Sequence, residues 1–284
     1  MDVGLRMGYG CVPMKISINC PMPQGHGRTT EGSEARAIIL NREDYERYPW
    51  PPASHPIDFS HFDKVAALLP DGAKIVGGVC GGPYEWVSQM MGTVGLSYAL
   101  ADDPELVDEM FRRIGELHSS AVRQLSTHEA IGALRQGDDL GFKTSTFLSP
   151  PLLRRLVFPI YTEMADATHA AGKPFILHSC GNLAEVYDDL IDTCHIDAKH
   201  SFEDVIMPVA EFKRMYGDRV TALGGLDVDV ICRAGEQELR AYARKAIEDC
   251  FGDGYWALGT GNSLTDYMPV ENYMAVLDEG AKAV

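Results

Sequence analysis

A histidine and a cysteine separated by one residue form the sharpest chemical pattern in the chain. His178-Ser179-Cys180 directly follows the apolar run 174–177. Side chains at positions i and i+2 of an extended segment point the same way, so the imidazole and the thiolate can share one ion. Zinc accepts this pair of donors. The alternative is a buried, hydrogen-bonded histidine beside an inert cysteine, and only a third ligand would favour the metal.

Glu203 is the preferred candidate for the third ligand of such a site. It follows the apolar run 196–200, which would form the neighbouring strand of a parallel barrel. An acid at this position is equally compatible with the start of a helix, where the macrodipole stabilises a negative charge. The weaker candidates for the third ligand are Thr260, Asp139, Cys80 and Cys194.

Other polar side chains follow the apolar runs and could contact a substrate. Asp138 and Asp139 come directly after one run, and a carboxylate there can accept a proton or orient a substrate, so we expect a catalytic role for this pair. We expect Asp227, Thr260 and Asn262 to bind substrate, because each lies beside glycines that let a backbone approach a ligand closely. The alternative for Asp138 and Asp139 is an acid exposed to solvent. The alternative for the loop 259–263 is a tight turn without a binding role.

These candidates require a fold that brings several strand ends together. From residue 74 onward short apolar runs alternate with amphipathic stretches, which indicates parallel strands joined by right-handed crossovers. An α/β fold of the (β/α)8 TIM-type barrel places reactive groups at the carboxyl ends of its strands. The rival is an open doubly wound sheet, disfavoured because no glycine-rich phosphate-binding pattern follows the first strand. The apolar runs are 74–79, 130–134, 174–177, 196–200, 220–223 and 255–258, and the helical stretches fall near 84–100, 103–126, 150–171, 183–193, 206–215, 235–250 and 270–283.

The first 70 residues are harder to assign, because proline and glycine punctuate them. The pattern of 14–19 predicts one strand there. Six strand–helix units are visible over 71–284, fewer than the eight of a closed barrel. We therefore expect a single barrel domain over 1–284, with an irregular segment 1–70 and a shortened or incomplete N-terminal part.

Composition limits the partners and the compartment. The chain has 284 residues and a formal net charge of −16. An acidic excess argues against nucleic acid and against an anionic membrane surface as partners, because phosphates attract Lys and Arg. The seven cysteines are scattered, and the sequence shows neither a secretory signal nor an apolar run of membrane-spanning length. We therefore expect a cytoplasmic protein with reduced thiols.

Several short segments carry a resemblance to a known family. In chain order they are Gly81-Gly82-Pro83-Tyr84-Glu85, Asp102-Asp103-Pro104-Glu105-Leu106, Gly137-Asp138-Asp139-Leu140-Gly141, Leu148-Ser149-Pro150, His178-Ser179-Cys180-Gly181-Asn182, Gly259-Thr260-Gly261-Asn262-Ser263 and Pro269-Val270-Glu271-Asn272. Together they resemble the uroporphyrinogen decarboxylase superfamily. The chain is most similar to its branch of corrinoid-dependent methyltransferases related to methylcobamide:coenzyme M methyltransferase. The resemblance extends over 74–284.

The resemblance implies a (β/α)8 barrel with a zinc site. In these methyltransferases a His-x-Cys pair and a later Cys hold zinc, and a corrinoid protein docks at the barrel mouth. His178 and Cys180 match the pair, whereas the later Cys falls at Thr260, where this chain departs from the pattern. The more distant cobalamin-independent methionine synthases combine a His-x-Cys pair with a Glu on the next strand, which is similar to Glu203. The arginine-rich N-terminal motif of the decarboxylases has no match here.

By this resemblance we expect a zinc-dependent methyltransferase. It would move a methyl group between a small O- or N-methylated compound and a corrinoid (cobalamin) protein or a thiol acceptor. One alternative is a decarboxylase-like lyase acting on another carboxylated compound, for which Arg135 and Lys143 are the nearby cationic groups. The other alternative is a non-catalytic paralogue. A monomer and a homodimer are both compatible with the sequence.

Overall fold

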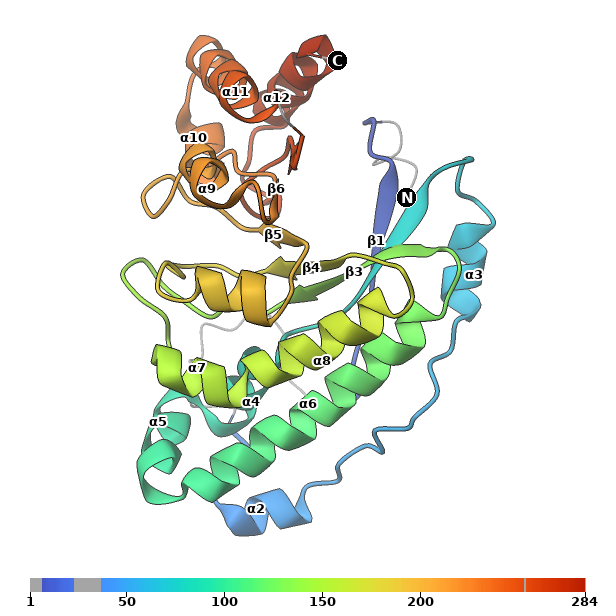
Figure 1. The fold of residues 1–284 in the computed structure, drawn as a ribbon, viewed down its shortest axis with the longest axis vertical. Coiled ribbons are helices and arrows are strands. Elements are labelled where there is room, and N and C mark those ends of the chain that lie inside the picture. Colours follow the sequence, from blue (N-terminus) through green and yellow to red (C-terminus); the bar gives the residue numbers. More distant parts are fainter. Residues whose placement is uncertain (1–6, 23–36, 253, 284) are drawn as a thin grey trace.

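Seven parallel strands form one curved sheet at the centre of the protein (Figure 1). The computed structural model describes residues 7–22, 37–252 and 254–283. Within these residues the sheet follows chain order, and each strand pairs in parallel with the next. The strands are β1 (Cys11–Ile16), β2 (Lys74–Val79), β3 (Ile131–Gly137), β4 (Phe175–His178), β5 (Ala198–His200), β6 (Thr221–Leu223) and β7 (Trp256–Ala257).

Helices follow the strands and cover the outer face of the sheet (Figure 1). The stretch predicted near 103–126 is α6, which begins where the Asp103 side chain accepts from the backbone N–H of Leu106 at 3.0 Å. The stretch near 150–171 is divided in two, and Pro159 at the start of the second helix cannot donate a helical hydrogen bond. The helices are α2 (Arg42–Arg47), α3 (Ser60–Ala66), α4 (Pro83–Met91), α5 (Thr93–Asp102), α6 (Pro104–Ser126), α7 (Pro150–Leu156), α8 (Phe158–His169), the π-helical η2 (Asp189–Thr193), α9 (Val209–Tyr216), α10 (Val228–Arg233), α11 (Glu236–Cys250) and α12 (Val270–Ala283).

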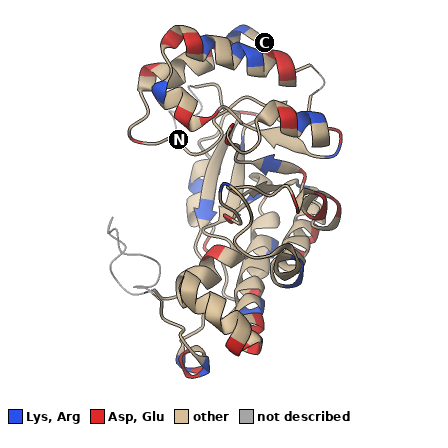
Figure 2. Ribbon diagram, turned by 90° about the vertical axis from the view of Figure 1, so that its left-hand side faces the viewer, with Lys and Arg blue, Asp and Glu red and all other residues tan. Residues whose placement is uncertain are grey.

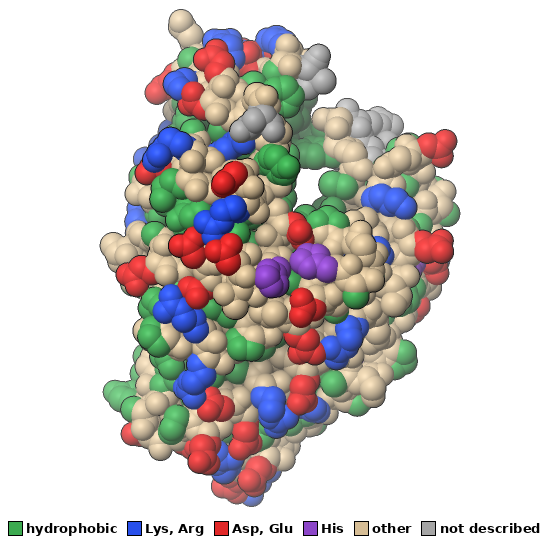
Figure 3. Space-filling model, viewed as in Figure 1, with side chains coloured by type: hydrophobic (Ala, Val, Ile, Leu, Met, Phe, Trp, Pro, Cys, Tyr) green, Lys and Arg blue, Asp and Glu red, His purple; other side chains and the backbone are tan. Residues whose placement is uncertain are grey.

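The sheet is curled into a half-barrel, which confirms the predicted α/β fold of the TIM type. Strands β1 and β7 are the two edges of the described sheet. Figure 3 shows an opening between the C-terminal part of the chain and the side formed by β1 and β2. Just before β1, the hydroxyl of Tyr9 contacts that of Tyr273 on α12 and links the two sides. The described residues thus supply seven strands, in keeping with the incomplete barrel expected from the sequence.

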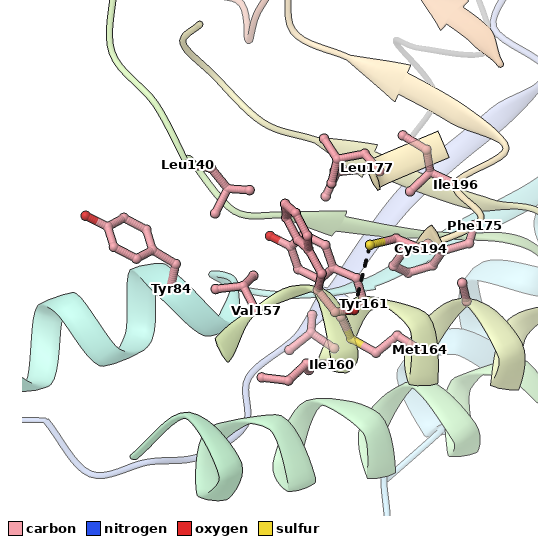
Figure 4. Close-up of a cluster of buried hydrophobic side chains, with 14 of the residues drawn as sticks. Tyr84, Leu140, Val157, Ile160, Tyr161, Met164, Phe175, Leu177, Cys194 and Ile196 are labelled. Atoms are coloured by element: carbon pink, nitrogen blue, oxygen red, sulfur yellow. Dashed lines mark hydrogen bonds between the residues drawn. The ribbon is translucent and has the colours of Figure 1, made fainter. Parts of the chain in front are cut away.

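The main core lies between the sheet and helices α6 and α8 (Figure 4). Tyr161 of α8 packs against Phe175 and Leu177 of β4, and all three side chains are fully buried. Because successive side chains of a strand alternate, Ile176 and His178 face the inside of the half-barrel. Burial of a side chain of this size contributes about 1.5–3 kcal/mol. This layer therefore anchors the strand whose end carries the histidine of the predicted site.

The first 70 residues contain more regular structure than the sequence indicated. The strand predicted over 14–19 is observed three residues earlier as β1, and helices α2 and α3 were not predicted. Helix α2 begins where the side chain of Asn41 accepts from the backbone N–H of Asp44 at 3.0 Å. An asparagine cap can be recognised in a sequence only when apolar residues at helical spacing follow it. Helix α2 buries none of its residues and therefore lacks this pattern.

Acidic and basic side chains are interspersed over the outer helices (Figure 2). Several form ion pairs, such as Arg154 with Asp189 at 2.8 Å and Arg155 with Asp108 at 2.7 Å. Among the described residues, no helix combines the length and apolar character that crossing a bilayer requires. The mixed charge seen in this view differs from the continuous basic surface that binds nucleic-acid phosphates.

Candidate metal centre at the carboxyl ends of the strands

Two histidines end neighbouring strands and lie side by side inside the half-barrel. The register pairs Gly137 of β3 with His178 of β4, and His178 with His200 of β5. Residues paired in this way point to the same face of a sheet. The structure therefore places His178 at a strand end, as predicted, and adds His200 beside it. Gly137 has no side chain, which leaves space next to the His178 ring.

Asp139, His178 and Cys180 each bring one ligand atom to within 4.8 Å of the others. Nε2 of His178 lies 3.7 Å from Sγ of Cys180 and 3.9 Å from Oδ1 of Asp139. Donor atoms on one tetrahedral zinc, bound at about 2.0–2.3 Å, are separated by roughly 3.3–3.8 Å. A thiolate together with a carboxylate also balances the charge of a dication. The distance between His178 and Cys180 falls in this range and that between His178 and Asp139 lies just above it, so the three residues, called the cluster below, could hold a zinc ion.

Close contact between two loops holds Asp139 beside Cys180. Oδ1 of Asp139 accepts the backbone N–H of Cys180 at 3.0 Å. Gly181, with φ of +89°, lies so near the other loop that a Cβ would be 2.0 Å from the carbonyl carbon of Gly141. Only glycine combines this backbone conformation with such a close approach. The carboxylate of Asp139 is thus held beside Cys180, although its side chain is 42% exposed.

The thiol of Cys180 lies in a polar but desolvated setting. Its Sγ is 3.3 Å from Oγ of Ser201 and accepts from Nδ2 of Asn262 at 3.3 Å. Burial raises the pKa of Cys180 to about 11, the hydrogen bond with Ser201 lowers it, and Asp139 raises it. A thiol with this pKa is protonated at neutral pH. A cation at the cluster would therefore be needed to convert it to the thiolate.

His200 is a site residue that the sequence prediction missed. Its Nδ1 lies 2.5 Å from Nδ1 of His178, and its Nε2 lies 3.2 Å from the carbonyl oxygen of Thr260. Burial lowers the pKa of His200 to about 4 and is the main cause of the still lower pKa of His178. Both rings are neutral at pH 7, which is the form that ligates metal. The signal available in the sequence was its place at the end of the apolar run 196–200.

Asp138 points away from the cluster, although it is adjacent to Asp139. It is fully buried and accepts the backbone N–H groups of Tyr84 at 3.0 Å and Glu85 at 2.9 Å, at the start of α4. The hydroxyl of Tyr161 donates to it at 2.7 Å. Burial, followed by the charge of Glu85, raises the pKa of Asp138 to about 7. Both oxygens are thus engaged in fixing α4 beneath the site.

Glu203 lies outside the cluster, because the chain turns sharply after β5. His200 faces the inside of the half-barrel, so alternation already points Glu203, three residues later, the other way, and Ser201, with φ of +98°, turns the chain between them. Instead Glu203 lines a small cavity together with Lys199, whose side chain is buried among aromatic rings. Asp139 occupies the place beside His178 and Cys180 that we predicted for Glu203.

The weaker candidates for the third ligand are also placed elsewhere. Cys194 is buried, and its Sγ donates to the carbonyl of Phe158 at 3.7 Å (Figure 4). Cys80 is an exposed free thiol after β2 and does not belong to the cluster. Thr260 turns its carbonyl to His200, and its hydroxyl donates to the carbonyl of Asn262 at 2.5 Å.

Of the residues predicted to bind substrate, Asn262 contacts the cluster and Asp227 does not. Asp227 is buried, and its two oxygens accept the backbone N–H groups of Asp204 and Asp229, each at 2.7 Å. It thereby caps α10 and ties it to the loop after β5. Thr260 adjoins the cluster through the main-chain contact with His200.

Two cationic side chains extend into the half-barrel from β1 and β3. The register pairs Lys15 with Gly78 and Gly78 with Arg135, so Lys15 and Arg135 lie on the inner face on either side of Gly78. Burial, and then the neighbouring charge of Arg135, lower the pKa of Lys15. Lys143, the other cation considered from the sequence, is exposed after β3.

The guanidinium of Arg135 reaches the level of the cluster. Its two terminal nitrogens lie 3.9 and 4.0 Å from the point where a Cβ of Gly137 would be, and Cδ2 of His178 lies 3.9 Å from the same point. Burial lowers the pKa of Arg135, and the carboxylate of Asp139 raises it. A positive charge therefore stands beside the cluster and can attract an anionic group of a substrate.

The fold and the site together define an α/β barrel of the TIM type with a metal-type cluster at its strand ends. The chain belongs to the uroporphyrinogen decarboxylase (URO-D) family, whose family model matches residues 27–282. Among solved structures, a methyltransferase from Methanosarcina mazei is similar, with a TM-score of 0.72 and 15% identity over 99% of this chain and 82% of that chain. A putative vitamin-B12 independent methionine synthase from Listeria monocytogenes has a TM-score of 0.49 and 12% identity, covering 80% and 70% of the two chains. A search of the curated proteins finds no match.

Proposed function

We propose that this chain is a zinc-dependent methyltransferase that moves a methyl group between a small O- or N-methylated compound and a corrinoid protein or a thiol. The observation that carries the proposal is the convergence of Asp139, His178 and Cys180 at the strand ends. Three protein ligands leave a fourth coordination position, as in catalytic zinc sites. Family membership and the similar fold of the Methanosarcina mazei methyltransferase support the proposal.

In this proposal Nε2 of His178, Sγ of Cys180 and a carboxylate oxygen of Asp139 hold the metal. Zinc, when bound, supplies a Lewis acid that lowers the pKa of a thiol or polarises the heteroatom carrying the methyl group. The backbone N–H of Cys180 fixes the carboxylate of Asp139, and Asn262 donates to the sulfur. Orientation by fixed neighbours of this kind is what a transfer between two bound reactants requires.

The other predicted site residues have defined places in the proposal. Thr260 and Asn262 lie beside the reacting groups, on the loop after β7, where a substrate would contact them. Asp138 acts beneath the site by anchoring α4, and Asp227 shapes the loop after β6. A corrinoid protein would approach from the carboxyl ends of the strands, because the cluster faces that side.

Metal content tests the proposal, and Glu203 provides a matched control. We expect about one zinc per chain in anaerobically purified wild-type protein and in Glu203→Gln, and its loss in His178→Ala, Cys180→Ser and Asp139→Asn. A methylated corrinoid followed by its visible spectrum then reports transfer, and the three zinc-free variants should be inactive. Wild-type protein that takes up no zinc from a zinc-containing medium would contradict the proposal, as would equal zinc loss in the Glu203 variant.

A decarboxylase-like lyase is the second candidate, and Arg135 with Lys15 favours it. Two cations on the inner face, one on either side of Gly78, could hold a substrate carboxylate. Release of carbon dioxide that survives Cys180→Ser and is lost in Arg135→Met would identify a lyase. Protein that binds no metal and shows neither reaction would correspond to the non-catalytic paralogue.

A further inference from the structure

The hydrogen bonds of His178 and His200 form a chain with a fixed direction. The carbonyl oxygen of Thr260 can only accept, so Nε2 of His200, 3.2 Å away, carries a proton. In a neutral imidazole the other nitrogen then has a free lone pair. Nδ1 of His200 therefore accepts from Nδ1–H of His178 at 2.5 Å. This leaves a lone pair on Nε2 of His178, the nitrogen 3.7 Å from the sulfur of Cys180.

We propose that His200 is a positioning residue that sets the tautomer of His178 and so presents Nε2 of His178 as the ligand atom of the cluster. The consequence for metal binding rests on the proposed function, whereas the tautomer is a property of the metal-free chain. Metal-ligating histidines commonly donate their second ring N–H to an outer partner, and loss of that partner lowers metal affinity about 10–100-fold. Here the partner is a second imidazole, which a main-chain carbonyl holds in turn.

The packing around His200 shows that this contact is built into the fold. Gly224, with φ of +74°, follows β6, and a Cβ there would lie 2.2 Å from the carbonyl oxygen of Thr260 and 3.2 Å from Nε2 of His200. A side chain at Gly224 would therefore collide with the hydrogen bond between His200 and Thr260, and glycine avoids this collision. The register between β4 and β5 holds the two imidazole rings at a centroid separation of 4.7 Å.

The arrangement also gives Thr260 a defined part. In this chain the main-chain oxygen of Thr260 supports the outer partner His200, while Asp139 stands beside the cluster sulfur as a carboxylate. His178 is thus oriented through two successive hydrogen bonds, from His178 to His200 and from His200 to Thr260.

Nuclear magnetic resonance of the metal-free protein at pH 8 tests the tautomer directly. Long-range ¹H–¹⁵N spectra of ring-labelled histidine are compared for the wild type, His200→Asn and His200→Leu, with His178→Ala to assign the signal. The amide oxygen of Asn can replace Nδ1 as acceptor, whereas Leu fills the space without one. We expect the Nδ1–H tautomer of His178 in the wild type and in His200→Asn, and the Nε2–H tautomer in His200→Leu. A proton on Nε2 of His178 in the wild type would overturn the inference, even if one variant failed to fold.

Titration with Co²⁺, followed by its thiolate absorption, provides the second measurement. We expect affinity to fall about 10–100-fold in His200→Leu and to stay near the wild-type value in His200→Asn. Equal Co²⁺ affinity of the wild type and His200→Leu would overturn the positioning role. If the wild type bound no Co²⁺ while the tautomers followed the expected pattern, the assignment of His200 would stand and the zinc function would fail.

Discussion

Nδ2 of Asn262 donates a hydrogen bond to Sγ of Cys180 across 3.3 Å, although 82 positions separate the two residues in the chain. The contact joins the loop after β7 to the loop after β4 on the inner side of the half-barrel. A hydrogen bond donated to sulfur favours the thiolate over the thiol. Asn262 therefore works in the same direction as a bound cation and against the burial that raises the pKa of Cys180.

Replacing Asn262 with Leu should raise the pKa of Cys180 further and slow its alkylation. Loss of one hydrogen bond to a charged group, at about 1.5 kcal/mol, lowers the thiolate fraction roughly tenfold. The rate of reaction of Cys180 with iodoacetamide at pH 9, in metal-free protein, is read by peptide mass spectrometry. Exposed Cys11 on the same molecule is the internal control and should react at an unchanged rate. Equal rates for Cys180 in the two proteins would show that the amide does not stabilise its thiolate.

Gly181→Ala should separate the two loops that hold the cluster. The substitution places a Cβ on a residue with φ of +89° and 2.0 Å from Gly141, so strain of about 1–3 kcal/mol is joined by a clash. Gly172→Ala is the matched control, because Gly172 has φ of +69° and nothing within 4 Å of its added Cβ. Urea unfolding should show a larger loss of stability for the Gly181 variant, which should also lose zinc. Similar losses in both variants would mean that backbone strain alone is measured.

Much of the fold could be predicted because the outward face of the central strands is buried under the helices, so these strands appear as short apolar runs. The run 74–79 is β2 with the same bounds, and the run 255–258 contains β7. The edge strand β1 was predicted three residues too late, since Pro13 and Lys15 interrupt its pattern and its inner face is exposed where the barrel is open. Edge strands carry a weaker apolar signal than central ones, so their bounds are harder to assign from sequence.

The cluster could be predicted only in part, because the sequence does not state which face each residue takes. His178 and Cys180 were found from their spacing, whereas the choice between Asp138 and Asp139 depends on β3 ending at Gly137. Glu203 was expected as the third ligand, but it lies on the loop beyond Ser201, whose positive φ turns the chain, and a non-glycine residue gives little warning of such a turn. Recognition of His200 required the register between β4 and β5.

Asp138→Asn should make stability less dependent on pH in the weakly acidic range. The folded pKa of about 7 lies above the unfolded value of about 3.9, so the folded state binds more protons between these values. The contribution of Asp138 is therefore complete below about pH 4 and is lost as pH rises to 7, by up to roughly 4 kcal/mol. Urea midpoints at pH 5 and pH 7.5 should show the stability advantage of the wild type over Asp138→Asn shrinking. The variant of the exposed residue Asp71, Asp71→Asn, is the control. A stability advantage of the wild type over Asp138→Asn that did not change with pH would contradict the raised pKa of Asp138.

Lys199→Met should stabilise the protein more at pH 6.5 than at pH 9.5, relative to the wild type. Lys199 is buried against Phe202, and burial lowers its pKa to about 7 from an unfolded value of about 10.4. The unfolded state therefore binds more protons between these values, and stability rises with pH from about 7 until the unfolded-state amine is neutral at about 10.4. Methionine fills a similar volume without charge. The difference in free energy of unfolding between the two proteins, up to a few kcal/mol, should therefore shift in favour of the wild type as pH rises. Urea midpoints measure this difference in stability, and the variant of the exposed residue Lys64, Lys64→Met, is the control. A difference that stays constant with pH would show that the buried amine does not titrate in this range.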